Sequence, residues 1–445
     1  MTEHELSRRF AEGIVALARK PLPVDVADAA RTHLLNILGT AAGASGHSAV
    51  DAVISVGQAA GGRAVAPVVG RAETLDPIYA AIANGLAAHI DDYDDTDLET
   101  VIHPSAASMA AGLGLALVRG VPGGVLLRAF ALGCEVQLRL GRALTPAHYD
   151  AGWHITGTCG VVGAAATAAV ILGLDEPHTN RALGIAASQT LGHREGFGTA
   201  LKSLHPGRAA GNGVLAASLA ERGFTGSQRV FEAPRGLLRV LSPSHDAAYL
   251  MDGLGQRWDL LDNVVKPYPC GIVIHPLIDA AIALSPRVGD SGRIVRIAVD
   301  CHPLVVELTG NSAPRTGLQA RFSAVHGIAA GLVDGQVGLP QYADARVTAA
   351  DLTWLRGMIV LHVDERMPRD AVRIAVELDD GSQVVQAIDH ARGSMARPMT
   401  TAEVREKVAN LVEPVLPGRT EKLIRAVDAL EQSNDVRELA EVVAR

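Results

Sequence analysis

The stretch Lys266-Pro267-Tyr268-Pro269-Cys270-Gly271 marks the point where the character of the sequence changes. Before it, Ala-rich apolar runs recur at helical spacing between glycines, which predicts helix after helix. Beyond it, alternating apolar residues indicate strands, and Asp380-Gly381 predicts the turn of a β-hairpin. We therefore expect an α+β fold, with a large all-α helical domain over residues 1–265 and a smaller α+β lid domain over 266–414. Residues 415–445 are expected to return to the first domain as a C-terminal helix.

The apolar patterns also place individual elements. Thr2 and Glu5 form a capping box for a first helix, and Asp25 caps a second. Further helices are expected at residues 77–89, 105–117, 125–138, 160–174, 179–189 and 209–222. After the joint at Lys266, helices are expected at 275–284, 327–333, 401–411 and 421–431, and strands at 294–299, 358–363, 372–378 and 384–388. The two prolines of the joint make it the candidate hinge.

The composition narrows the class of protein. Hydrophobic residues make up 48% and aromatic residues 3%, and there are 46 glycines, which favours helices packed closely through small side chains. The net charge is −8 and the basic residues are scattered, so nucleic acid is not an expected partner. The four cysteines lie far apart without a CxxC pair, which predicts neither a zinc nor an iron–sulfur site.

Two further features bear on location. The N-terminus lacks the apolar segment of a secretory signal. Residues 151–174 carry no charged side chain apart from His154, but their Gly, Ala and Thr content and central polar residues indicate a buried helix rather than a membrane span. We expect a cytoplasmic protein with no membrane partner, in which the cysteines stay reduced.

The densest polar cluster is His89-Ile90-Asp91-Asp92-Tyr93-Asp94-Asp95-Thr96, which is followed by His103-Pro104-Ser105. Four carboxylates within five positions repel one another, so local stability does not explain them. One interpretation is a solvated helix end. A second is magnesium binding, because the acidic run matches the DDxxD pattern of terpenoid synthases, although no second acidic motif follows and aromatic residues are few. The third is an acid–base site in which an aspartate positions a histidine.

Cationic groups stand in other clusters. His154 precedes the predicted buried helix, where it can also serve core hydrogen bonding. Lys202, His205 and Arg208 precede a predicted helix start, which suits an anionic substrate but also an exposed basic loop. Cys270, close to His275, is expected to be a buried apolar residue.

Together these groups point to proton transfer at a carbon next to a carboxylate. Removing that proton places a second negative charge on the carboxylate, and each cationic donor aimed at it is worth roughly 3–4 kcal/mol. A histidine that takes or gives the proton contributes about 10²–10⁴-fold. The sequence has no Gly-rich phosphate loop, nucleophile elbow or dinucleotide fingerprint.

The same segments resemble the MmgE/PrpD family, which holds 2-methylcitrate dehydratase, cis-aconitate decarboxylase and iminodisuccinate epimerase. The resemblance covers nearly the whole chain. Its motifs are Ala83-Asn84-Gly85 with His89, Asp92-Tyr93-Asp94-Asp95-Thr96, His103-Pro104-Ser105, Gly152-Trp153-His154, residues 202–210, Lys266-Pro267-Tyr268-Pro269-Cys270 and Phe322-Ser323. It implies a helical domain, an α+β lid, a homodimer, and a pocket between the domains without metal or cofactor.

The resemblance also implies roles for single residues. Asp92 would orient a histidine, and His103 and His154 would be the acid–base pair. Lys202 would act with them and hold a substrate carboxylate. The resemblance also implies that Thr96 belongs to the site and that His275 holds a substrate carboxylate. Beyond the resemblance, Lys266, Arg208 and His326 are further expected substrate-binding residues. Two departures bear on the substrate: His326 stands where some members have a tyrosine after the Phe-Ser pair, and one additional residue lies between Thr96 and His103.

The resemblance thus implies a cofactor-independent lyase of the dehydratase type that acts on a small polycarboxylic acid such as 2-methylcitrate. Decarboxylation or epimerisation of a related acid, such as cis-aconitate or iminodisuccinate, is the first alternative. A magnesium-dependent isoprenoid enzyme and a non-catalytic polycarboxylate-binding protein are the others. Chelator sensitivity separates the magnesium enzyme from the rest, and binding without turnover would identify the binding protein.

Overall fold

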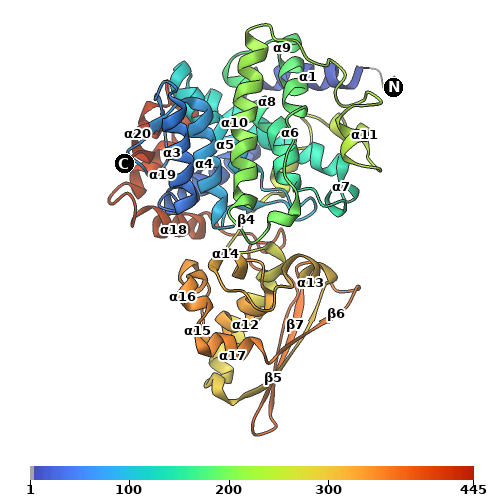
Figure 1. Ribbon diagram of the computed structural model, residues 1–445, viewed down its shortest axis with the longest axis vertical. Helices are drawn as coiled ribbons and strands as arrows, with labels where there is room; N and C mark the ends of the chain where they lie inside the picture. Colours follow the sequence, from blue (N-terminus) through green and yellow to red (C-terminus); the bar gives the residue numbers. More distant parts are fainter. Residues whose placement is uncertain (1–4) are drawn as a thin grey trace.

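The computed structural model describes residues 5–445, and it forms a large helical lobe and a smaller lobe joined at a narrow waist (Figure 1). The expected α+β fold, with a large helical part and a smaller α+β part, is confirmed. The capping box predicted at Thr2 falls outside the described residues. Asp25 does not cap the second helix, because that helix begins one residue earlier, at Val24 after Pro23.

The helical lobe is built around one buried helix, α8 (Ile155–Ile171). All but one of its residues are buried. Burial on every face is possible because the helix carries no charged side chain and consists mainly of Gly, Ala, Val and Thr. It packs against α5, α6, α9 and α10. The main helices of this lobe are α1 (Leu6–Ala18), α2 (Val24–Gly43), α3 (Ser48–Ala60), α4 (Pro77–Ile90), α5 (Pro104–Arg119), α6 (Gly123–Leu144), α9 (Glu176–Ala187) and α10 (Leu201–Glu221), with short α7 (Ala147–Asp150) and α11 (Leu237–Leu241).

Glycines let the central helices approach closely. A Cβ added at Gly85 of α4 would lie 2.8 Å from the Cα of Gly207 in α10, and one at Gly207 would lie 2.5 Å from the carbonyl oxygen of Ile82. No side chain fits between these backbones. This contact fixes the end of α4, which carries the acidic cluster, against the start of α10.

The smaller lobe holds a four-stranded sheet in the order β6-β5-β7-β8. Strands β5 (Ile294–Cys301) and β6 (Ile359–Val363) are parallel, and β7 (Val372–Leu378) is antiparallel to β5 and to β8 (Gln383–Ile388). Helix α12 packs on β7 and β8 and against α15. The helices of this lobe are α12 (His275–Val288), α13 (Pro303–Thr309), α14 (Gly317–Ala320), α15 (Ala324–Asp334), α16 (Asp344–Val347) and α17 (Ala350–Arg356).

The chain then returns to the helical lobe (Figure 1). Helix α18 (Thr401–Val412) packs on α2, and its Val404 and Val408 belong to the helical core. Helices α19 (Thr420–Asp428) and α20 (Arg437–Val443) follow. The return therefore comes at α18 rather than at residue 415, because the apolar face of α18 finds its partner on α2.

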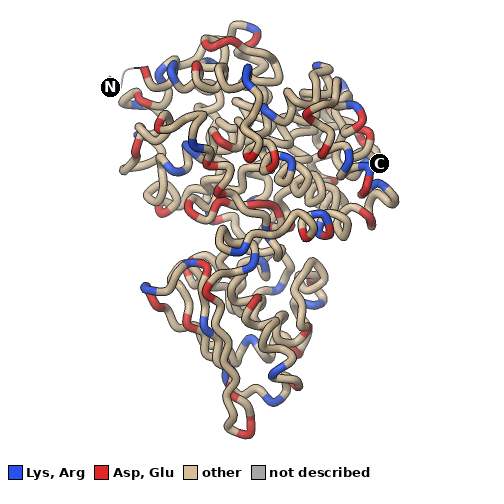
Figure 2. The backbone as a smooth tube through the Cα atoms, turned by 180° about the vertical axis from the view of Figure 1, so that it is seen from behind, with Lys and Arg blue, Asp and Glu red and all other residues tan. Residues whose placement is uncertain are grey.

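Four short strands tie the loops of the helical lobe together. β1 (Ala66–Pro67) pairs with β2 (Thr74–Leu75), and β3 (Asp95–Thr96) pairs with β4 (Val264–Val265). Acidic and basic residues are interspersed over both lobes (Figure 2). Among the described residues, no helix combines the length and the apolar character that crossing a membrane requires.

Candidate active site

A cavity lies where the two lobes meet, with about 460 Å³ of empty space including its mouth. One wall comes from the helical lobe and the joint, and carries the charged and imidazole groups. The opposite wall comes from the smaller lobe and is mainly apolar. The lining residues are Asp92, Thr96, Val101, His103, Tyr149, His154, Phe197, Lys202 and Lys266 on the first wall, and Gly271, Ile272, Val273, Leu308, Thr309 and Phe322 on the second.

The acidic segment reaches the cavity through a tight turn at the end of α4. Asp92 has φ 49°, in the left-handed region that aspartate tolerates better than most residues. The chain then enters β3, and its pairing with β4 is extended by a hydrogen bond from the Lys266 amide to the Asp94 carbonyl. The turn and the strand pair place the carboxylates beside Lys266.

The starts of three helices also meet at the cavity. His103 is the N-cap residue of α5, His154 is the N-cap residue of α8, and Lys202 lies in the first turn of α10. Pro104 at the first position of α5 favours that start. Helix N-termini carry partial positive charge, so this arrangement favours an anionic ligand.

Asp92 binds both lysines of the cavity. Lys202 Nζ lies 2.5 Å from Asp92 Oδ1, and Lys266 Nζ lies 3.1 Å from Asp92 Oδ2. Burial opposes the charge of Asp92, but the two ammonium groups outweigh it and hold the pKa of this carboxyl well below its usual range. Burial lowers the pKa of Lys202 although Asp92 opposes the change. Asp92 thus holds the two lysine side chains in place, and each keeps N–H groups that Asp92 does not bind.

Asp94 holds two imidazoles. Its Oδ2 lies 2.6 Å from His89 Nδ1 and its Oδ1 lies 3.1 Å from His103 Nδ1. The Asp95 carbonyl, 2.8 Å from His103 Nδ1, can only accept, so this nitrogen carries the hydrogen. His103 Nε2 forms no hydrogen bond with any described residue and is the nitrogen available to a ligand. The expectation that Asp92 orients a histidine is therefore corrected: Asp94 does, because the turn at Asp92 directs that side chain to the lysines.

His154 has a different partner. Its Nδ1 lies 2.8 Å from Nδ1 of His205, and its ring contacts those of His89 and Phe197. Burial, and then the charge of Lys202, lowers the pKa of His154, so the ring is neutral at neutral pH. Burial also lowers the pKa of His89 to about 3 and that of His205 to about 4. The cavity wall thus holds His154 as a neutral ring whose Nδ1 is engaged by His205.

The four carboxylates of the cluster point to four different sets of partners. Asp91 pairs with Arg321 of the smaller lobe, at 2.6 Å, and Asp95 accepts from Asn263, at 2.6 Å. Asp92 and Asp94 bind the lysines and the histidines. The side chains of His89, Asp92, Asp94 and His103 do bring potential metal ligands within 4.8 Å of one another. A divalent cation there would face both ammonium groups, so the donor set suits proton transfer better than magnesium.

The comparisons with known proteins agree with this geometry. Residues 8–250 match the model of the MmgE/PrpD N-terminal domain, and residues 268–432 match that of the MmgE/PrpD C-terminal domain. The chain belongs to the MmgE/PrpD family.

Members of this family with related sequences include several decarboxylases. Cis-aconitate decarboxylase of Mus musculus is 28% identical over 377 residues, which cover 81% of this chain and 77% of that protein. The cis-aconitate decarboxylase-like protein oryM of Aspergillus oryzae is 28% identical over 411 residues, 85% of this chain and 84% of that protein. Cis-aconitate decarboxylase of Aspergillus terreus is 24% identical over 407 residues, 84% and 83% respectively.

Of the nine expected site residues, six lie together in the cavity wall: Asp92, Thr96, His103, His154, Lys202 and Lys266. The Thr96 hydroxyl is buried and has no hydrogen-bond partner among the described residues, so a ligand can supply one. His275 lies outside the wall, with its Nε2 3.4 Å from the Cys270 carbonyl.

Two further expected substrate-binding residues, Arg208 and His326, also lie outside the cavity wall. Arg208 is exposed on α10, because this helix begins at Leu201 and not at residue 209, which turns Arg208 about 120° away from Lys202. His326 is buried in the smaller lobe, where its Nε2 donates to the Gln341 carbonyl at 2.9 Å and its Nδ1 accepts from Arg356 at 3.3 Å. Both assignments are corrected.

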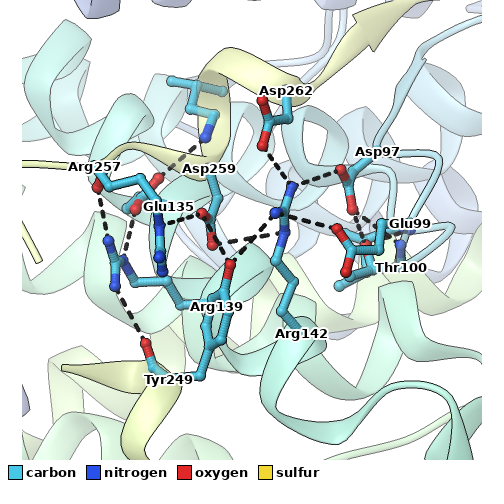
Figure 3. A network of polar contacts seen from close by, with 12 residues as sticks. Asp97, Glu99, Thr100, Glu135, Arg139, Arg142, Tyr249, Arg257, Asp259 and Asp262 are labelled. Atoms are coloured by element: carbon cyan, nitrogen blue, oxygen red, sulfur yellow. Dashed lines mark hydrogen bonds and ion pairs between the residues drawn. The ribbon is translucent and has the colours of Figure 1, made fainter. Parts of the chain in front are cut away.

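The sequence motifs contain His89 and Asp94 but do not single them out as site residues. They give His205 only as a cationic group for an anionic substrate, and not as the partner of His154. They also give no sign of a supporting network around Arg142 of α6 (Figure 3). The Arg142 guanidinium lies 3.1 Å from Asp97, 2.9 Å from Asp262 and 3.2 Å from Glu99. Because Asp97 also binds Thr100, this network holds the loop that carries Val101, with φ 53°, and leads to His103.

Proposed function

We propose that this protein is a cofactor-independent lyase that transfers a proton at a carbon next to a carboxylate of a small polycarboxylic acid. The observation that carries the proposal is the shared wall of the cavity, which Lys202, Lys266, His103 and His154 line together. The Nδ1 atoms of both histidines are engaged, and their Nε2 atoms form no hydrogen bond with a described residue. The lysines and the three helix starts favour a carboxylate-rich ligand.

The chemistry needs a base and a group that stabilises charge. His154 is neutral, so its free nitrogen can accept a proton from carbon. Removing this proton puts a second charge on the adjacent carboxylate, and Lys202 can stabilise it through N–H groups that Asp92 leaves free. His103, held by Asp94, can deliver a proton to the leaving group from its Nε2 once it is protonated.

Dehydration of a hydroxy acid is the reaction that this pair fits first, because it needs a base at carbon and an acid at the departing hydroxyl. Decarboxylation is the second candidate. The curated relatives named above support it, since they carry the name cis-aconitate decarboxylase at 24–28% identity. Loss of carbon dioxide needs only a proton donor at carbon, which either histidine can supply.

We also predict that the protein is a homodimer.

The test follows turnover of 2-methylcitrate, citrate, cis-aconitate and iminodisuccinate by proton NMR, with and without chelator. The proposal predicts conversion of at least one acid at a rate that chelator leaves unchanged. Loss of water identifies the dehydratase, and release of carbon dioxide identifies the decarboxylase. Binding of these acids by calorimetry without turnover, or a rate that chelator abolishes, would contradict the proposal.

A further inference from the structure

His154 is cut off from solvent, with 1% of its surface exposed. A buried base that takes a proton must return it to bulk water before the next turnover, and the side chains packed around it decide by which route. The rings of His89 and Phe197 contact the His154 ring, and the charge of Lys202 acts on it. The side-chain hydrogen bond of His154 joins its Nδ1 atom to Nδ1 of His205, at 2.8 Å.

The hydrogen bond between His154 and His205 has the geometry that proton transfer between two imidazoles requires. Two imidazole nitrogens at hydrogen-bond distance need one hydrogen between them, so one donates and the other accepts. His205 Nε2, on the far side of the ring, forms no hydrogen bond with any described residue. The His205 ring then faces His193, with the ring centroids 6.5 Å apart, and His193 is exposed.

The backbone fixes this row of three rings. The His154 amide donates to the Gly192 carbonyl at 3.1 Å, the Arg194 amide donates to the Gly152 carbonyl at 2.8 Å, and Trp153 and His193 form a β-bridge. Gly192, with φ 104°, packs directly on the His205 ring, and a Cβ there would lie 2.9 Å from its Cγ. The segment that carries His193 is therefore held beside the segment that carries His154.

We propose that His205 and His193 form a proton relay between His154 and solvent; this inference rests on the proposed function. When His154 Nε2 takes the substrate proton, its Nδ1 hydrogen passes to His205 Nδ1. The Nε2 hydrogen of His205 then passes through a bridging water to His193 and to solvent. Each ring gains one N–H bond and loses one, so both end as the other neutral tautomer, and no electrons are transferred. The reverse sequence delivers a proton to the site.

A purely structural His205 would only satisfy the hydrogen bond of His154. The variant His205→Gln separates the two roles, because an amide can keep this hydrogen bond but cannot pass a proton on. His193→Gln interrupts the relay at its solvent end. His178→Gln, at the start of α9 and outside the relay, is the matched control. Turnover of the acid accepted by the wild type is measured at low buffer concentration and with increasing imidazole.

The relay predicts that His205→Gln lowers turnover at low buffer by about 10-fold or more, and that imidazole restores it in a saturable way. His193→Gln should show a smaller loss with the same rescue, while the wild type and His178→Gln should not respond to imidazole. Normal turnover of His205→Gln, or a loss that imidazole does not restore, would overturn the relay alone. Absence of turnover by the wild type on every acid would overturn the proposed function, and the relay with it.

Discussion

Lys202 and Asp92 form a buried ion pair, at 2.5 Å, across 110 residues of sequence. Asp92 ends the turn after α4, and Lys202 lies in the first turn of α10. The close contact of Gly85 with Gly207 brings these two helix ends together. The packing of two helices through glycine thus sets the position of the cation that we assign to the substrate carboxylate.

Replacing Lys202 by Met should lower kcat/KM by about 10²–10³-fold, the usual loss for one donor to a developing oxyanion. Lys266 still neutralises Asp92 in this variant, so the fold should persist. Steady-state kinetics with the accepted acid and circular dichroism test both statements. Lys422→Met, at an exposed lysine, is the control. Activity of Lys202→Met within a few-fold of the wild type would remove Lys202 from the mechanism.

Replacing Arg142 by Gln should lower the free energy of unfolding by about 3–5 kcal/mol, because the buried Asp97 would lose its countercharge and Asp259 would keep only Arg257, at 3.4 Å. Urea denaturation measures this loss. Arg119→Gln breaks a partly exposed pair with Glu221 and should cost about 1 kcal/mol or less. Equal effects of the two substitutions would show that the network in Figure 3 does not stabilise the loop before His103.

His326 should make stability depend on pH without affecting catalysis. Burial lowers its pKa to about 4, from an ordinary value of 6.5. The unfolded chain therefore binds a proton below pH 6.5 while the folded chain does not. The neutral ring therefore contributes fully to the free energy of unfolding above about pH 6.5, and this contribution is lost as the pH falls towards 4.

Between pH 7 and pH 5 the free energy of unfolding of the wild type should fall by about 2 kcal/mol more than that of His326→Leu. Urea titrations at both pH values measure the difference. At pH 7 the variant should keep kcat/KM within a few-fold of the wild type, because His326 lies outside the cavity wall. A large loss of substrate affinity would instead show that His326 contributes to substrate binding.

Gly85→Ala tests the contact between α4 and α10. The added methyl group would lie 2.8 Å from backbone, so the helices must separate, at a cost of about 1–3 kcal/mol. Gly46→Ala is the control, because no atom lies within 4 Å of a Cβ at that position. Thermal unfolding of both variants measures the difference. A Gly85→Ala protein as stable as the control would contradict the packing described here.

The sequence predicts the helices well where alanine periodicity is strong, as in α4, α5 and α6. It misplaces the starts of α8 and α10 for a physical reason. Gly157 and Gly160 in α8, and Pro206-Gly207 in α10, are residues that usually interrupt helices in isolation. In the folded chain, burial and close helix contact outweigh these local preferences.

The motifs also locate the candidate site but not the partners inside it. Asp92 and Asp94 are two residues apart, and only the left-handed turn at Asp92 decides that the first meets lysines and the second meets histidines. Likewise, the contact between His154 and His205 spans 51 residues and depends on how α8 packs on α10. Such pairings cannot be predicted from the local sequence, because they depend on how distant helices pack.

The proposed function assigns to His154 the proton transfer at a carbon next to a carboxylate. The most direct measurement is proton NMR of the accepted acid in deuterated water, with the wild type and His154→Gln compared at equal concentration. With the wild type we expect the C–H bond beside a carboxylate to be lost in a dehydration, or deuterium to appear there after exchange or decarboxylation. With the variant, which should stay folded, we expect a rate at least about 10²-fold lower. Equal rates for the two proteins, or conversion by the wild type in which no C–H bond beside a carboxylate is lost, exchanged or formed, would contradict this role of His154.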